Sequence, residues 1–174
     1  MFPMEETLAG AVQIHAASQR IDDGEQVSGP AAQRFLAGVQ TFKQVFRGSS
    51  LTTKQMAAIR RDPALRIYDN ADRALACVYD QSRALCHPDR ERRTDTTRTP
   101  DLSRCVDNCA NGARTDEHAR IIEREVADLG EEIDSPLTPE PIRDRLIERA
   151  ARRRSDLEQH YALRIGKLTE NALT

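Results

Sequence analysis

Four cysteines, Cys77, Cys86, Cys105 and Cys109, are the residues whose type and spacing best suit a specific chemistry. Three residues separate Cys105 from Cys109, a spacing typical of structural zinc sites because a tight turn brings both thiolates to one side. Eight residues separate Cys77 from Cys86, and a turn at Asp80-Gln81-Ser82 would fold this segment back on itself. We therefore expect the four thiolates to bind a structural Zn²⁺ ion.

Two histidines and two alternative roles of the cysteines bear on this hypothesis. His118 follows Cys109 in the first turns of a predicted helix and is a reserve ligand that could replace one cysteine, whereas His87 adjoins Cys86 and is hard to direct at the same ion. Four protein ligands would leave no open position, so the site would be structural rather than catalytic. Alternatively, the cysteines are small buried hydrophobes, or two of them form a reversible disulfide that acts as a redox switch.

Two arginine clusters are candidate nucleic-acid contacts. The first is Arg90, Arg92, Arg93 and Arg98 in a polar segment, and the second is Arg152, Arg153 and Arg154 in the last predicted helix. Arginines of this kind could neutralise DNA phosphates. Acidic residues lie among or beside both clusters, so a solvated charged surface is the alternative interpretation. No aromatic side chains are interleaved with the arginines, which makes stacking on single strands a poor hypothesis.

The sequence shows no convincing catalytic motif. It has no glycine-rich phosphate loop, no His-Glu-x-x-His and no calcium-loop pattern of acids. Cys86 and His87 are sequence neighbours, which rarely point at each other, so they do not suit a nucleophile and its base. We expect no enzymatic activity and no small-molecule substrate.

The elements that would position these residues are mostly helices. In the N-terminal unit, residues 1–62, apolar spacing predicts a helix over 4–20, and a second helix capped by Ser28 with Phe35, Leu36, Val39, Phe42 and Phe46 on one side. Thr52 and Gln55 form a capping box for a third, short helix that stops at Asp62-Pro63.

Two further units follow along the chain. Residues 63–114 form a Cys-rich, largely irregular segment with extended propensity around Leu65–Tyr68 and Cys77–Tyr79 and a polar loop over 88–100. Residues 115–174 form an antiparallel helical hairpin that begins at a Thr115 cap. Its second helix is predicted to have Thr138 as its N-cap and Pro139 at its first position, and it carries an apolar stripe from Ile142 to Leu168. We predict an all-α or mainly α fold.

Composition agrees with this fold and limits the function. The 174 residues include no Trp and 4% aromatics, so the core must be built mainly from aliphatic side chains. The net charge of −2 gives no global basic field for nucleic acid, although only three of the 26 basic residues are lysine. A coding bias explains that excess of arginine most simply, and selection for bidentate contacts is the alternative. The acidic N-terminus and the lack of a long apolar stretch predict a soluble, cytoplasmic protein in which thiols stay reduced.

Several short segments around the cysteines carry a resemblance. They are Ala76–Asp80, Ala84–Pro88, Pro100–Cys105, Cys109–Asn111 and Ala113–Asp116. Together they resemble the cysteine-containing C-terminal segment of integrase-like proteins of actinobacterial mobile elements, over about residues 48–160. The resemblance implies a role beside DNA recombination or element maintenance, with DNA or an integrase-type protein as partner.

The resemblance does not imply a recombinase active site. Tyrosine recombinases use an Arg, a His-x-x-Arg and a nucleophilic Tyr, but here Ile121 stands three places after His118, and Tyr161 lies in the last predicted helix. We therefore expect a non-catalytic, zinc-stabilised accessory or DNA-associated module. The alternative is a protein-interaction or oligomerisation module that acts through its C-terminal hairpin.

Overall fold

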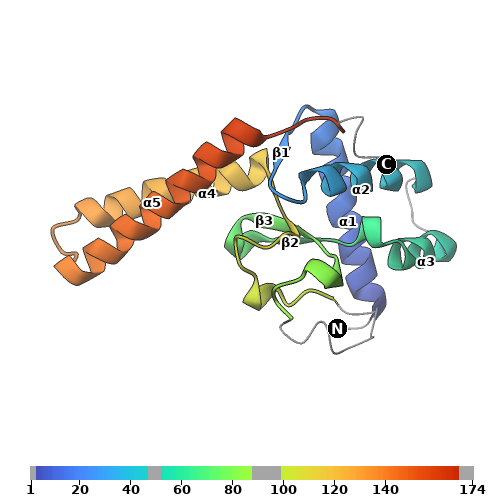
Figure 1. The fold of residues 1–174 in the computed structure, drawn as a ribbon, viewed down its shortest axis with the longest axis horizontal. Coiled ribbons are helices and arrows are strands. Elements are labelled where there is room, and N and C mark those ends of the chain that lie inside the picture. Colours follow the sequence, from blue (N-terminus) through green and yellow to red (C-terminus); the bar gives the residue numbers. More distant parts are fainter. Residues whose placement is uncertain (1–2, 47–51, 88–98, 169–174) are drawn as a thin grey trace.

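The protein is mainly helical with one small antiparallel sheet, and two long helices leave its body as an arm (Figure 1). The computed structural model describes residues 3–46, 52–87 and 99–168. Its α-helices are α1 (Pro3–Asp22), α2 (Ala32–Val45), α3 (Thr53–Arg61), α4 (Asp116–Asp134) and α5 (Glu140–Leu163). Its strands are β1 (Val27–Ser28), β2 (Ile67–Asn70), β3 (Leu75–Val78) and β4 (Gly112–Thr115), in the sheet order β1-β4-β3-β2. Short 3-10 turns are η1 (Pro63–Leu65), η2 (Ala71–Arg73), η3 (Gln81–Arg83) and η5 (Leu102–Arg104).

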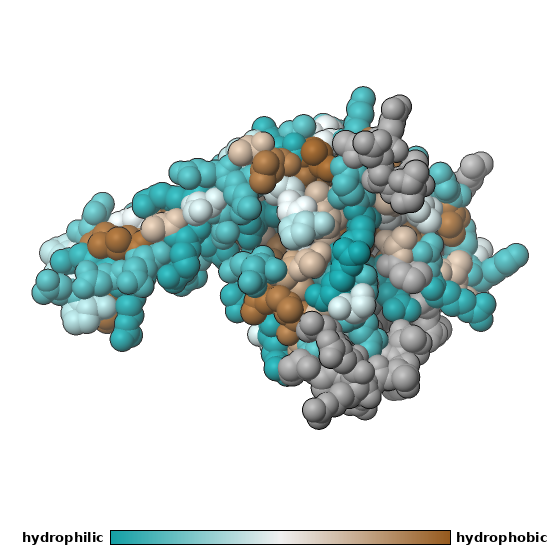
Figure 2. Space-filling model, viewed as in Figure 1, coloured by the Kyte–Doolittle hydropathy of each residue, from teal (hydrophilic) through white to brown (hydrophobic). Residues whose placement is uncertain are grey.

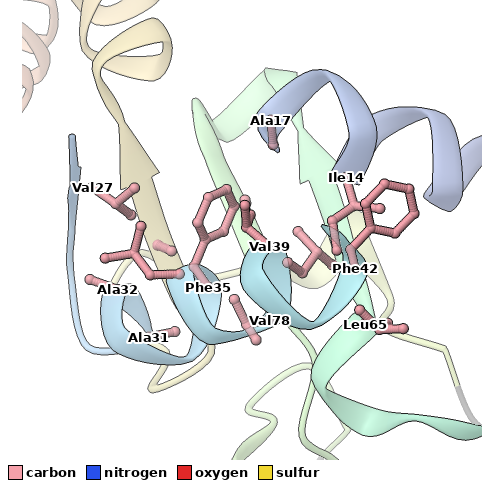
Figure 3. Packing of buried hydrophobic residues seen from close by; sticks show 14 residues of the cluster. Ile14, Ala17, Val27, Ala31, Ala32, Phe35, Val39, Phe42, Leu65 and Val78 are labelled. Atoms are coloured by element: carbon pink, nitrogen blue, oxygen red, sulfur yellow. The ribbon is translucent and has the colours of Figure 1, made fainter. Parts of the chain in front are cut away.

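The main core lies where α1 and α2 meet the sheet (Figure 3). Phe35 and Phe42 of α2 are each 1% exposed and are surrounded by aliphatic side chains, including Ile14 of α1. The same cluster contains Leu65, Ile67, Ala76, Val78 and Ala113. Residues of the predicted units 1–62 and 63–114 thus share one core.

Strand β3 separates this core from a second one. Ala76 and Val78 belong to the main core, whereas Cys77 and the following Tyr79 belong to a cluster with Ala84 and Cys86. This alternation is the period of two that a strand imposes on its side chains. The segment predicted to be largely irregular therefore contributes three strands of the sheet, since its extended propensity is realised by pairing of β3 with β2 and β4.

Local capping signals are confirmed at two helices and wrong at two others. Thr52 and Thr115 each cap a helix with a capping box, through Gln55 and His118 respectively. Ser28 is not a cap, because it lies in β1, three residues before Ala31, which is the N-cap of α2. The segment around Ser28 is extended because it pairs with β4. Pro139 rather than Thr138 is the N-cap of α5.

The predicted helical hairpin is confirmed by α4 and α5, which pack side by side (Figure 1). Ala150 of α5 and Ile122 and Leu129 of α4 are buried at or near the seam between them. The predicted apolar stripe of α5 is partly wrong, because Ile142 and Tyr161 are 46% and 43% exposed. The buried histidine His160 lies on the packed side instead.

Candidate functional site

The four cysteines are all free and buried, although they come from separate segments. Cys77 lies in β3 and belongs to the same buried cluster as Cys86, which follows η3. Cys105 caps the end of η5, and Cys109 lies in the turn that leads into β4, where its backbone carbonyl accepts a hydrogen bond from the Gly112 N–H. The sheet brings these segments together because Cys77 pairs with Gly112.

The electrostatics of the thiols also reflect their proximity. Burial raises the pKa of Cys77 to about 12, and negative charge on Cys105, Cys109 and Cys86 contributes to this rise. Burial also raises the pKa of Cys105, with Cys109 and Cys86 as the next contributions. Within the described part of the chain, however, no three His, Cys, Asp or Glu side chains are placed as a group that could hold a metal ion. In this structure the four buried thiols do not form a set of metal ligands.

The two histidines named as possible ligands have other contacts. His118 accepts the Thr115 backbone N–H at Nδ1 (3.0 Å), and its Nε2 lies 2.7 Å from the Asp69 carboxylate. His87 places Nε2 3.0 Å from the Thr99 carbonyl oxygen. His118 thereby ties the start of α4 to β2, and its role as a reserve ligand stays a prediction.

Arg34 is a residue that sequence reasoning missed. It extends from α2 and donates hydrogen bonds to the Val78 carbonyl (3.0 Å), the Ala110 carbonyl (2.7 Å) and Oδ1 of Asn111 (3.1 Å). Its guanidinium thus bridges the segment after Cys77 and the segment after Cys109. No sequence signal marks Arg34, because the two segments come together only in the sheet.

The base of the arm is held by a second group that the sequence did not indicate. His160 of α5 is 1% exposed, with Nδ1 2.7 Å from Ser28 Oγ and Nε2 2.9 Å from the Asp116 carboxylate. A carboxylate only accepts, so Nε2 carries the hydrogen and Nδ1 accepts from Ser28. Burial lowers the pKa of His160 despite the opposing effect of Asp116.

This serine, histidine and carboxylate resemble a hydrolytic triad only in composition. Ser28 is 4% exposed, and its strand is paired with β4, so a substrate carbonyl has no approach to the hydroxyl. The backbone completes the clamp: the Val27 and Ile165 N–H groups each donate to the carbonyl of the other at 2.8 Å. The Glu25 carboxylate accepts the Glu117 N–H at the start of α4 (2.7 Å). These contacts fix the arm to the body through both of its helices.

Of the two arginine clusters predicted to contact DNA, only the one on α5 lies within the described residues. Arg90, Arg92, Arg93 and Arg98 lie outside the described residues. Of the second cluster, Arg153 is largely buried and pairs with Glu125 (2.9 Å) and Asp156 (3.2 Å). Arg152 is exposed and lies 3.9 Å from Glu148, while Arg154 is also exposed.

Carboxylates balance this cluster on α5. A polar pocket of about 590 Å³ is lined by four arginines and four carboxylates: Arg73, Arg149, Arg152 and Arg153 with Asp72, Asp107, Glu125 and Asp156. Tyr161, the tyrosine of the last helix, donates its hydroxyl to Glu123 at 2.6 Å, and that hydrogen bond raises its pKa.

No protein-family model, no curated protein and no solved structure matches this chain. In the described part of the chain, none of the helices combines the length and apolar character of a membrane span. The resemblance to integrase-like proteins stays a prediction, and the function is inferred from the geometry of the arm and of the cysteine region.

Proposed function

We propose that this protein is a non-catalytic interaction module that acts through its α4–α5 arm. The observation that carries the proposal is that the arm projects from the body while its base is clamped by His160, Asp116 and the pairing of Val27 with Ile165 (Figure 1). A rigid projecting hairpin presents a defined helical surface at a distance from the core. The resemblance suggests that an integrase-type machinery is the setting in which this module works.

One face of α5 has the spacing of a helix-pairing surface. Exposed residues recur there in alternating steps of four and three, which is the heptad spacing of a coiled-coil seam. They are Glu140, Asp144, Ile147, Ala151, Arg154, Glu158 and Tyr161. We call this set the α5 stripe, and it lies about a quarter turn from the seam with α4, at roughly 100° per residue.

The charges of the α5 stripe favour a second copy of the chain as its partner. Its first turns carry Glu140 and Asp144, and Arg154 lies beyond the central Ile147. If two α5 helices pair antiparallel about Ile147, Glu140 of each copy meets Arg154 of the other. A parallel pair would place like charges together, which is destabilising. We therefore propose antiparallel self-association.

Sedimentation equilibrium over a range of protein concentrations tests this proposal. The wild-type chain should associate reversibly, and Ile147→Glu should weaken association at least about tenfold by placing charges opposite each other at the centre. Ile142→Glu is the matched control, because Ile142 is equally exposed (46% against 47%) but lies on another face of α5. A wild-type chain that is monomeric throughout, or equal effects of the two substitutions, would show that the proposal is wrong.

Charge reversal tests the orientation. Glu140→Arg alone should weaken association, and so should Arg154→Glu alone, because each creates like-charge contacts across the pair. The double variant restores opposite charges in the antiparallel arrangement and should recover wild-type association. No recovery in the double variant would contradict the antiparallel arrangement.

DNA contact is a second candidate function, favoured by the exposure of Arg152 and Arg154 on α5. A mobility-shift titration with duplex DNA at several salt concentrations tests it. Binding should weaken as salt rises, and Arg152→Gln with Arg154→Gln should reduce both the affinity and the salt dependence. A chain that binds no duplex even at low ionic strength would exclude this function.

A further inference from the structure

The environment of Arg34 bears on the chemical state of the four cysteines. Its hydrogen bonds to residues that the structure describes go to neutral oxygens: two backbone carbonyls and the Asn111 amide. Among the described residues it forms no ion pair within 4.0 Å. Arg34 is half-buried, and a charged group that is partly withdrawn from water is stabilised by opposite charge nearby.

The hydrogen bonds of Arg34 place its guanidinium beside the segments that carry two of the cysteines. Arg34 bonds the carbonyl of Val78, next to Cys77, and that of Ala110, next to Cys109. Burial lowers the pKa of Arg34, and the positive charge of Arg83 adds to this effect whereas the Asp80 carboxylate opposes it. Negative charge on Cys77 or Cys109 would stabilise the guanidinium further.

The remaining cysteines reach the same region through their neighbours. Cys109 points its thiol towards the Arg83 carbonyl (3.8 Å), beside Ala84, which packs with Cys77 and Cys86. Leu102, which precedes Cys105 by three residues, packs on the same cluster. The packing of Ala84 and Leu102 thus places the segments that carry all four cysteines around one buried cluster.

We infer that Cys77, Cys86, Cys105 and Cys109 bind one Zn²⁺ ion as four thiolates, and that Arg34 is the positioning residue that offsets the charge of this site. Four thiols lose four protons to solvent when the ion binds, and four S–Zn bonds form. The resulting centre has a net charge of −2, and the guanidinium of Arg34 offsets one of these charges. Two disulfides would be neutral and would offer Arg34 no such partner, and the same holds for four buried thiols.

The structure also shows what binding must change. Because the thiols are not yet placed as a ligating group, they must turn towards a common centre when the ion enters. A cysteine side chain has a single rotatable bond before its sulfur, and rotation about this bond would redirect each thiol. Asn111, 1% exposed, donates to the Asp80 carbonyl (2.8 Å) and accepts from Arg34, which ties the two halves of the region together.

The direct test uses the full-length wild-type chain, purified without added metal. Metal analysis should find about one equivalent of zinc per chain, since structural sites retain their ion through purification. Replacement by Co²⁺ should give the visible spectrum of a tetrahedral site with intense thiolate-to-cobalt charge transfer. These measurements need no variant, so they remain decisive if a Cys→Ser chain fails to fold.

Two outcomes would overturn the metal site. Well-folded protein with less than about 0.3 equivalents of zinc, and no cobalt spectrum on titration, would show that the thiols are structural hydrophobes. Mass spectrometry that finds disulfides between these cysteines in freshly purified protein would establish the redox alternative.

The role of Arg34 is tested by zinc affinity in competition with a chelator. Arg34→Gln should weaken zinc binding about 10–100-fold while the stoichiometry and the tetrahedral cobalt spectrum are kept, as for other residues that support metal ligands. Arg34→Lys keeps the positive charge and should lose less than Arg34→Gln. Arg20→Gln, which removes an arginine paired with Glu25 away from the thiols, is the control and should leave zinc affinity unchanged.

A purely structural Arg34 predicts a different pattern. Both Arg34 variants would then lower the stability of the metal-free protein and leave zinc affinity unchanged, which would contradict the charge-compensating role. Failure of the metal site would not affect the proposal for the arm, because self-association is measured at the α5 stripe.

Discussion

At the residue scale, the buried polar side chains of this protein connect segments that lie far apart in the chain. His160 joins α5 to Ser28 of β1 and to Asp116 of α4, and Arg164 adds a second bond to the same carboxylate (2.9 Å). Burial alone would raise the pKa of Asp116, but the Gln26 N–H, Arg164 and His160 together hold it below its usual range. The clamp therefore needs an ionised Asp116 and a neutral His160.

This requirement predicts a pH dependence of stability. The pKa of His160 is lower in the folded protein than its ordinary value of 6.5, so the unfolded chain binds a proton at a higher pH than the folded chain does. Stability should therefore be full above about pH 6.5 and fall as the pH drops below it. Ser28, Asp116, Arg164, Arg114 and Tyr161 are the polar and charged residues that face the ring.

Urea unfolding at several pH values measures the effect. His160→Gln should lose about 1–3 kcal/mol at about pH 7.5, the typical cost of breaking buried hydrogen bonds. Its free energy of unfolding should also vary less between about pH 7.5 and 5.5 than that of the wild type. A variant with the same pH slope as the wild type would show that His160 does not carry this dependence.

At the scale of elements, close backbone approach decides how the helices are placed. A Cβ atom on Gly38 of α2 would lie 2.3 Å from the carbonyl oxygen of Ala64 in η1. Glycine thus lets α2 approach η1 so closely that any side chain would have to push the two elements apart. A Cβ atom on Gly130 of α4, by contrast, would have no side chain and no other element within 4 Å.

These two glycines form a matched pair for mutation. Gly38→Ala should destabilise the protein by several kcal/mol or prevent folding, because backbone cannot yield as a flexible side chain can. Gly130→Ala should stabilise it by about 0.5–1 kcal/mol, since alanine favours the helix and meets open space. Thermal and urea unfolding check both, and a neutral Gly38→Ala would contradict the close approach of α2 and η1.

At the scale of the whole molecule, two small cores lie on either side of β3, and an arm extends from the body. The arm is largely hydrophilic, with isolated apolar side chains exposed on it (Figure 2). The core around Cys77, Tyr79, Ala84 and Cys86 has few large side chains. A bound ion would contribute most to the folding free energy in the region where least apolar surface is buried.

Metal removal should therefore have a local effect first. If the cysteines hold zinc, chelation should lower the Tm, and it should speed amide exchange in β3, β4 and residues 99–111 before it does so in α4 and α5. The reason is that these segments surround the cysteine core, while the arm has its own seam between α4 and α5. Hydrogen exchange with and without chelator measures this order, and uniform acceleration across the chain would contradict it.

Much of the architecture follows from the sequence by itself. Apolar spacing predicts α1, α2 and the hairpin. The capping box at Thr52 and the N-cap at Thr115 mark two helix starts to the residue, because these signals act over three or four neighbouring positions. The predicted Ser28 cap is wrong because pairing with β4, which lies far along the chain, outweighs the local preference of serine for a helix N-cap.

The site divides in the same way. The sequence by itself indicated which four thiols could act together, since spacing between cysteines is a local property. Only the tertiary structure brought Arg34 beside them and joined His160 to Ser28 and Asp116, because those contacts span from 44 to 132 positions of the chain. The sheet order β1-β4-β3-β2 decides them, and no local spacing encodes which strands will pair.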